Sequence, residues 1–228
     1  MHYTSIARHK TPVAPLATSA FRIDSVVHML TGDVTCLIAE TERRFEERAV
    51  FGIGSDTQNQ HSPASWLASL LEDVANYVQD EGSLARPILV QAPIAALLHR
   101  DTPLACDAAI KRTRFCPQEI CIEFADASLN MPAADTAKSV RNLRKKGFRV
   151  SVNSMKSWAA PMDSNLQMML DTLRVDARKI ETEPDLRARI EASAASGIAI
   201  IAENAAWRDG EMLAKLGVCF ARAPRSDA

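Results

Sequence analysis

Seven polar residues of this chain each stand at the end of a short apolar run. Where such runs are parallel strands of one sheet, their ends meet at one edge, and catalytic and binding side chains gather there. Carboxylate oxygens at such an edge bind hard divalent cations, and an arginine fork fits phosphate oxygens. Seven polar side chains are more than packing requires, so we expect them to mark a functional site. They are Glu40, Gln91, Glu123, Asn153, Asp176, Glu203 and Arg222.

The first of these residues follows a predicted β-hairpin. Two apolar runs, Phe21 to Val27 and Val34 to Ala39, flank a turn tripeptide at residues 31–33, and we expect two antiparallel strands there. Residues 1–18 have prolines and no periodicity, which predicts a flexible N-terminal arm. Residues 19–228 are then expected to form a single domain.

Predicted helices alternate with predicted strands after the hairpin. Pro63 and Pro103 each follow a residue that caps a helix, and Gly147, Gly197 and Gly217 end helices. Strands and helices that alternate at this spacing favour an α/β barrel with a largely parallel sheet, with an open doubly wound sheet as the alternative. The predicted strands after the hairpin are Ile88 to Val90, Ile120 to Phe124, Phe148 to Val152, Leu173 to Val175, Ile198 to Ala202 and Val218 to Phe220.

The composition indicates a globular protein. The 228 residues are 47% hydrophobic and 24% charged with a net charge of −1, which excludes a disordered chain and gives DNA or an anionic membrane no strong attraction to the whole molecule. No apolar stretch approaches the roughly 20 residues that span a bilayer, and the first residues do not form a signal peptide. The odd number of scattered cysteines predicts reduced, mostly buried thiols, and together these features predict a cytoplasmic protein. The cysteines are Cys36, Cys106, Cys116, Cys121 and Cys219.

Four segments together resemble a known family. The most specific one ends in Ile122-Glu123-Phe124 and is similar to a segment ending in L-E-I-T-E, with Asp126 where the second glutamate usually stands. In their order and spacing over residues 20–224, the segments resemble the EAL family, bacterial barrels that hydrolyse cyclic di-GMP. The resemblance implies a TIM-barrel-like EAL fold whose first strand pair is antiparallel. The four segments are residues 117–124, 143–152, 196–203 and 216–217.

Several functional positions of the family are retained. The run that starts at Glu40 falls on the signature E-A-L-L-R-W, so the resemblance makes Glu40 the metal-binding glutamate and Arg44 the phosphate-binding arginine. Glu123 keeps its glutamate, Asp176 keeps the aspartate of K-I-D, and Glu203 keeps the first glutamate of E-G-V-E-T. The resemblance therefore implies a remnant ligand-binding site.

Other functional positions are lost. Gln91 takes the place of a metal-ligand asparagine of the family. Asn153 and Ser154 take the places of the paired aspartates of D-D-F-G-T-G. Arg174 replaces the lysine of K-I-D, and its pKa above about 12 excludes it as a general base. Arg222 replaces a glutamine.

These losses matter because two-metal hydrolysis of a phosphodiester needs carboxylates that hold two cations roughly 3.5–4 Å apart. The neutral oxygens of Asn153 and Ser154 are weak substitutes. We therefore expect no catalytic residues and no cofactor, and at most one weakly held Mg²⁺ or Ca²⁺ around Glu40, Glu123 and Glu203.

The retained glutamates have two interpretations. In the first, Arg44, Arg174 or Arg222 pairs with them, and the former active site is structural. In the second, these arginines grip the phosphates of an unhydrolysed dinucleotide. Lys156 and Trp158 count against the second, because they are bulkier than the G-T-G that they replace.

The sequence therefore predicts a catalytically inactive EAL-like regulator. It is expected to act by protein–protein interaction in cyclic di-GMP or motility-related signalling, as some short, stand-alone members of the family with eroded motifs do, with a partner that the sequence does not identify. The alternative is a non-hydrolysing cyclic di-GMP receptor. A third hypothesis is a weak cyclic di-GMP phosphodiesterase.

A basic run is a separate feature. It indicates a solvated helix face, with an acidic protein surface or nucleic acid as the alternatives, although too few aromatic residues accompany it for base stacking. Trp158 and Trp207 are predicted in loops, where they pack locally or anchor a protein interface. The basic run comprises Lys138, Arg141, Arg144, Lys145, Lys146 and Arg149.

Overall fold

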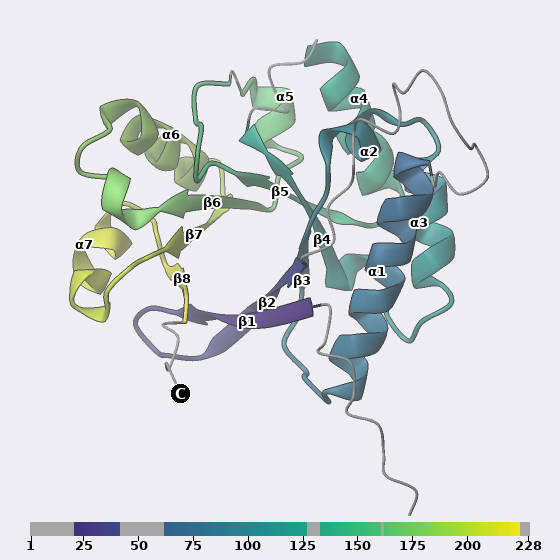
Figure 1. Ribbon diagram of the computed structural model, residues 1–228. Coiled ribbons are helices and arrows are strands. Elements are labelled where there is room, and N and C mark those ends of the chain that lie inside the picture. The colour runs from purple at the N-terminus through teal and green to yellow at the C-terminus, as the bar shows by residue number, and fades with distance from the viewer. Residues whose placement is uncertain (1–20, 42–61, 127–132, 161, 224–228) are drawn as a thin grey trace, which may run out of the picture.

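The strands close into a barrel in the order β1 to β8 (Figure 1). The structure is a computed structural model, and it describes residues 21–41, 62–126, 133–160 and 162–223. The predicted α/β barrel is confirmed, and the alternative of an open doubly wound sheet is wrong. The strands are β1 Phe21–His28, β2 Val34–Thr41, β3 Ile88–Gln91, β4 Ile120–Ala125, β5 Arg149–Asn153, β6 Thr172–Asp176, β7 Ala199–Glu203 and β8 Phe220–Arg222.

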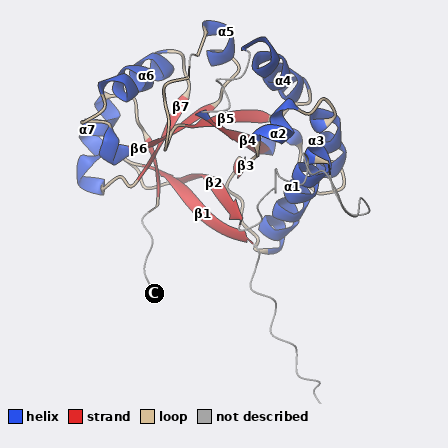
Figure 2. Cartoon of the chain, turned by 45° about the horizontal axis from the view of Figure 1, so that its top comes forward, coloured by secondary structure: helices blue, strands red, loops and turns tan. Residues whose placement is uncertain are grey.

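The described helices form an arc around the strands, with β1 on the open side of the arc (Figure 2). Helix α1 starts where the Ser62 hydroxyl accepts a hydrogen bond from the Ser65 amide, and its leucine and valine stripe is buried against the sheet. The helices are α1 Pro63–Asp80, α2 Ile94–Leu98, α3 Thr102–Ile110, α4 Ala133–Lys145, α5 Ser164–Gln167, α6 Pro184–Ala195 and α7 Gly210–Lys215. Short 3₁₀ turns lie at Pro117–Glu119, Ala177–Lys179 and Trp207–Asp209.

Strand β1 runs against the other strands. It pairs in antiparallel fashion with β2 and with β8, whereas β2 to β8 pair in parallel. The predicted antiparallel first strand pair is therefore confirmed. Because β1 is reversed, its first residues lie at the end of the barrel where β2 to β8 finish, and Arg22 pairs in register with Glu40. This end of the barrel, the mouth, thus receives side chains from the beginning of β1.

Apolar side chains fill the other end of the barrel. Val26, Ile38, Leu89 and Ile201 form a small buried cluster with two cysteines, and Phe220 packs against it. A larger core lies between the strands and the helices. The floor of the mouth is therefore a packed apolar layer. The polar side chains at the strand ends lie above this layer.

Three strands begin later than their apolar runs predict, and one local motif explains all three. The amides of Phe148, Ile198 and Val218 each donate back to a carbonyl of the preceding helix, five residues earlier, after a glycine with positive φ. A residue whose amide closes a helix cannot also begin a strand ladder. The last strand therefore starts at Phe220, and Arg222 is its final residue rather than a residue beyond it.

Other details differ from the sequence prediction. Helix α2 was not predicted, and α5 ends at Gln167, although Leu166, Met169 and Leu170 have helical spacing. Leu173 lies in β6, as predicted, because the chain turns at Asp171 to enter that strand. The cysteines are all free, and Cys36, Cys106 and Cys121 are buried, Cys219 is partly buried and Cys116 is exposed.

Two further expectations concern the N-terminal arm and a helix that could cross a membrane. The predicted arm, residues 1–18, lies outside the described residues. Among the described helices, none combines the length and the apolar character that a bilayer crossing requires.

The glycine at the end of α7 is predicted to be indispensable for packing. Gly217 has φ +82°, and a Cβ there would lie 2.5 Å from the Ala194 Cβ, whereas Gly197 has φ +79° and nothing within 4 Å. Gly197→Ala should cost about 1–2 kcal/mol for the left-handed backbone alone. Gly217→Ala should cost about 1–3 kcal/mol more because of the clash. Urea unfolding of both variants measures the difference, and equal losses would contradict the packing argument.

Candidate functional site

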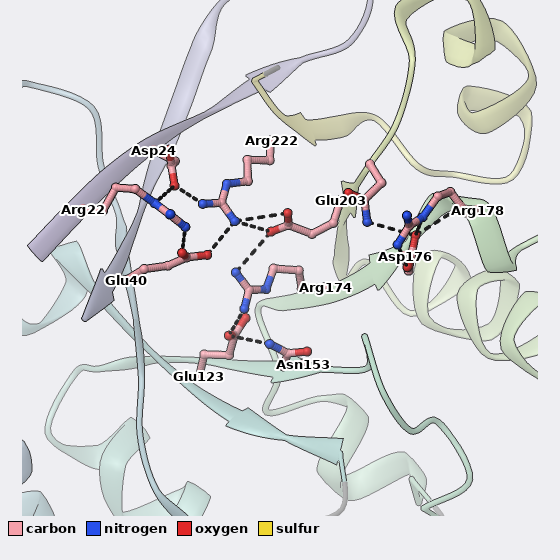
Figure 3. Close-up of polar contacts among 11 residues, drawn as sticks. Arg22, Asp24, Glu40, Glu123, Asn153, Arg174, Asp176, Arg178, Glu203 and Arg222 are labelled. Atoms are coloured by element: carbon pink, nitrogen blue, oxygen red, sulfur yellow. Dashed lines mark hydrogen bonds and ion pairs between the residues drawn. The ribbon is translucent and has the colours of Figure 1, made fainter. Parts of the chain in front are cut away.

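Most of the predicted site residues that the structure describes lie at the mouth of the barrel (Figure 3). Three arginines and four carboxylates from six different strands form one connected ion-pair network there. Their formal charges sum to −1, so the network is nearly neutral. Its members are Arg22, Asp24, Glu40, Glu123, Arg174, Glu203 and Arg222, with Asn153 hydrogen-bonded to Glu123.

Arg174, from β6, is the central cation of this network. Its Nη2 lies 2.7 Å from Glu123 Oε1, and its Nη1 lies 3.2 Å from Glu203 Oε1. Only 6% of Arg174, 2% of Glu123 and 7% of Glu203 is exposed to solvent. One buried guanidinium thus bridges the ends of β4 and β7, and in this environment its attraction to both carboxylates is strong.

Arg222, from β8, joins the second half of the network. Its Nη1 lies 2.6 Å from Glu40 Oε1 and 3.2 Å from Glu203 Oε2, and its Nη2 contacts Asp24. Glu203 is therefore shared between Arg222 and Arg174. The interpretation that arginines pair with the retained glutamates describes this geometry for Arg174 and Arg222, whereas Arg44 lies outside the described residues.

Two members from β1 were missed by the sequence analysis. Arg22 contacts Glu40, and its Nε lies 3.2 Å from Asp24 Oδ2. Both residues lie at the start of the reversed strand and, being two residues apart, face the same side of it. The predicted hairpin contained this signal, because an antiparallel first strand must bring its beginning to the end of the second.

Glu123 is the carboxylate with the least favourable environment for a charge. Burial raises its pKa above the ordinary glutamate value, and Arg174 and a hydrogen bond from Asn153 Nδ2 at 3.0 Å only partly oppose this. Glu123 Oε2 has no hydrogen-bond partner among the described residues. Burial of the Glu123 charge therefore costs free energy, and the neighbouring Arg174 reduces that cost.

Asp176 does not join the network. It accepts hydrogen bonds from the Arg178 guanidinium and from Asn204 Nδ2, and Arg178 holds the pKa of this carboxyl below its ordinary value. Figure 3 shows this pair set apart from Glu123. Sequence reasoning placed Asp176 at the mouth correctly by position, but the structure gives it separate partners.

A cavity of about 550 Å³ opens beside the network. Gln91, Lys156 and Trp66 line it together with Glu40 and Glu123. A second cavity, of about 510 Å³, lies on the other side, against Glu203 and Arg222. The mouth therefore keeps polar space around a centre that is filled by ion pairs.

The loop after β5 is fixed by a buried charge. Asp126 accepts hydrogen bonds from the Ser157 hydroxyl at 3.1 Å and from the Ala160 amide at 3.3 Å, and it forms an ion pair with Arg189 of α6. Asp126 therefore anchors this loop rather than the network.

The same loop holds one of the two predicted loop tryptophans. Lys179 Nζ donates to the Met155 carbonyl and lies 5.0 Å from the centre of the Trp158 ring, which packs against the core. Trp158 thus packs locally. The side chain of Trp207 lies outside the described part of the chain.

The donor set does not suit a divalent cation. Glu40, Glu123 and Glu203, the candidate ligands, each already contact a guanidinium. Within the described ranges, no group of three or more His, Cys, Asp and Glu side chains is placed to hold a metal ion. A cation entering the network would have to displace buried arginines from the carboxylates that compensate their charge.

Removing the central cation should destabilise the fold. Arg174→Gln leaves Glu123 and Glu203 buried with less compensation, and we expect a loss of about 3–5 kcal/mol at neutral pH. The loss should shrink at acidic pH, because protonation removes the unpaired charges. Arg187→Gln breaks an exposed pair with Glu191 and serves as the control, with an expected loss below about 1 kcal/mol. Similar losses in both variants, measured by chemical unfolding, would contradict the bridging role.

The raised pKa of Glu123 predicts a pH dependence. A carboxyl with a raised pKa in the fold binds a proton that the unfolded chain has released, so its contribution to stability falls as the pH rises above about 4.3, the ordinary glutamate pKa. The free energy of unfolding of the wild type, relative to Glu123→Gln, should therefore fall as the pH rises above about 4.3. Exposed Glu191→Gln should give a flat difference over the same range. A wild-type advantage that grows with pH would refute the argument.

The comparisons with known proteins agree with this architecture. No protein-family model matches the sequence, and no curated protein matches it significantly. Among solved structures, the EAL domain of Mycobacterium smegmatis DcpA is 16% identical at a TM-score of 0.69, covering 90% of this chain and 89% of its own. A PaMucR phosphodiesterase in complex with cyclic di-GMP is 15% identical at a TM-score of 0.65, over 89% of this chain and 88% of its own.

A longer protein shares the same fold. Klebsiella pneumoniae BlrP1, in a complex with manganese and cyclic di-GMP, is 14% identical at a TM-score of 0.64, and the match covers 90% of this chain but 54% of BlrP1. Identities this low establish the fold alone. The chain thus has the fold of the EAL domains, a TIM-like barrel with an antiparallel first strand pair, as its sequence motifs predict.

Proposed function

We propose that this chain is a catalytically inactive EAL-like regulator that acts by binding another protein. The process that the resemblance suggests is cyclic di-GMP or motility-related signalling. The observation that carries the proposal is the position of Arg174, whose guanidinium lies between Glu123 and Glu203.

Hydrolysis by a metal pair conflicts with this geometry. A relative with the same fold has been seen with manganese and cyclic di-GMP together. In this chain two retained glutamates are neutralised by Arg174, and Asn153 donates a hydrogen bond to Glu123 instead of offering a second carboxylate. Two cations held by bridging carboxylates would need both changes reversed. The residues present do not fit the metal, and no hydrolytic step is derived for them.

The same contacts argue against phosphate binding by the arginines. Both terminal nitrogens of Arg174 and of Arg222 contact carboxylates of the chain itself. A dinucleotide phosphate would have to replace these carboxylates and leave them buried without their cations, which is unfavourable. This supports a function that uses the outer surface of the barrel.

A second candidate function is binding of cyclic di-GMP without hydrolysis. The observation that favours it is the cavity of about 550 Å³, which combines Lys156 and Gln91 with the aromatic wall of Trp66. Here a phosphate would contact Lys156 rather than the buried arginines. Weak phosphodiesterase activity remains the third hypothesis, and the following experiment separates all three.

Purified protein incubated with cyclic di-GMP and Mg²⁺ or Mn²⁺ should release no linear dinucleotide above the enzyme-free blank, because the carboxylates hold guanidinium groups instead of metal. Chromatography measures the product, and PaMucR phosphodiesterase is the positive control. Calorimetric titration with cyclic di-GMP, with and without Mg²⁺, should show no binding heat.

Each opposite outcome identifies one of the other functions. Linear product formed by the wild type would establish a phosphodiesterase. Micromolar binding without product, weakened by Lys156→Gln and unchanged by the exposed control Lys215→Gln, would establish the receptor.

A further inference from the structure

Helix α4 carries three exposed cations along one face. Lys138, Arg141 and Lys145 are spaced by three and four residues, so they succeed one another on the helix surface, while Val140 and Leu143 are buried on the opposite face. We call Lys138, Arg141 and Lys145 the α4 stripe.

The neighbouring cations of the basic run already have partners, whereas the stripe does not. Arg144 pairs with Asp171, and Lys146 Nζ lies 3.2 Å from Asp107. Among the described residues, no ion pair involves a member of the stripe. Residues 137–149 contain no Asp or Glu, and Asp135 lies in the first turn of α4, where it interacts favourably with the helix dipole.

The absence of partners has an energetic consequence. Like charges three or four residues apart on a helix repel one another, and only the cations in the last turn gain from the helix dipole. Lys138 and Arg141 lie before that turn. Within α4 only Asp135, three residues before Lys138, offsets part of this repulsion, and an external anionic surface would relieve the rest.

An exposed apolar side chain follows a helix that contacts α4. Met168 directly follows α5 and is 73% exposed. Helix α5 contacts α4, and the ion pair of Arg144 with Asp171 ties the end of α4 to the segment that follows Met168. Figures 1 and 2 both show α4 and α5 as neighbours on the outside of the barrel. A flexible thioether next to fixed cations is a combination that protein interfaces use.

The surroundings favour a protein over nucleic acid. The chain has a net charge of −1, and the exposed carboxylates of Asp135 and Asp163 lie on α4 and at the start of α5. A continuous phosphate backbone would meet these carboxylates, whereas a local acidic patch on a folded protein can avoid them. The stripe also includes no aromatic residue on which a base could stack.

We propose that the α4 stripe, together with Met168, is a docking surface for an acidic face of a partner protein. The fitting partner presents carboxylates at the spacing of one helix face beside an apolar side chain. This inference rests on the proposed function, since it names the chemistry of the partner that such a regulator would bind.

A defined probe tests the surface. The probe is a labelled helical peptide with glutamates at positions i, i+3 and i+7 and one flanking leucine, and its binding is followed by fluorescence anisotropy at physiological salt. The variant Lys138→Gln/Arg141→Gln/Lys145→Gln should weaken binding at least tenfold. The matched control, Arg100→Gln/Arg208→Gln/Lys215→Gln, removes three exposed cations elsewhere and should change affinity less than twofold.

Two further measurements locate the contact. Carbodiimide should link the peptide glutamates to Lys138 and Lys145, as mapped by mass spectrometry. Met168→Ser should weaken binding of the peptide with the flanking leucine. It should not change the binding of a peptide in which alanine replaces that leucine. Circular dichroism and thermal unfolding establish that each variant is folded.

Several results would refute the proposed docking role of the α4 stripe. These are a peptide that does not bind, equal losses in the stripe variant and its control, or a DNA duplex that binds the stripe more tightly than the peptide. None of them depends on the mouth. Release of linear dinucleotide by the wild type would refute the proposed function and leave a positive peptide result intact.

Discussion

The charge balance at the mouth of the barrel is the constraint on which the rest of the site depends. Glu123 and Glu203 extend from the ends of β4 and β7 into a space with almost no solvent, and a cation between them makes that arrangement tolerable. Arg174 is that cation. Arg222 in the same way forms ion pairs with Glu203, Glu40 and Asp24. The positions of the strand ends are thereby fixed by electrostatics as well as by packing.

A carboxylate-lined barrel mouth can be neutralised by metal ions or by guanidinium groups, but one pair of oxygens cannot serve both at once. A metal exchanges ligands and can polarise a phosphate or a water molecule. A guanidinium is tethered to its strand by its own side chain and stays protonated at every relevant pH, so it cannot activate a bound water molecule as a metal does. Arg174 is therefore a fixed structural cation, whereas a lysine at this position could lose its proton.

Much of this could be predicted from the sequence, because the relevant signals are local. The hairpin, the alternation of helices and strands, and the glycines that end helices follow from turn chemistry and periodicity, and polar residues after apolar runs marked the strand ends. Pairings between distant segments could not be predicted. Asp24 and Arg222 meet only because β1 closes the barrel against β8, and Asp126 finds Arg189 across 63 residues of chain. Periodicity carries no information on such contacts, and neither ion pair has a local sequence signal.

A closed mouth shifts the question of function from the inside of the barrel to its outside. The helices of a barrel need apolar residues only where they face the strands, so their outer faces are free to change without disturbing the core. Some surface charges elsewhere are paired, as Arg112 with Glu72 and Arg144 with Asp171 illustrate. The α4 stripe differs from these pairs because it aligns three exposed cations on one helix face, and none of the three forms an ion pair among the described residues. Under the proposed function, the ion pairs of the mouth contribute to stability, and the α4 stripe offers an outer helix face through which the chain can bind a partner.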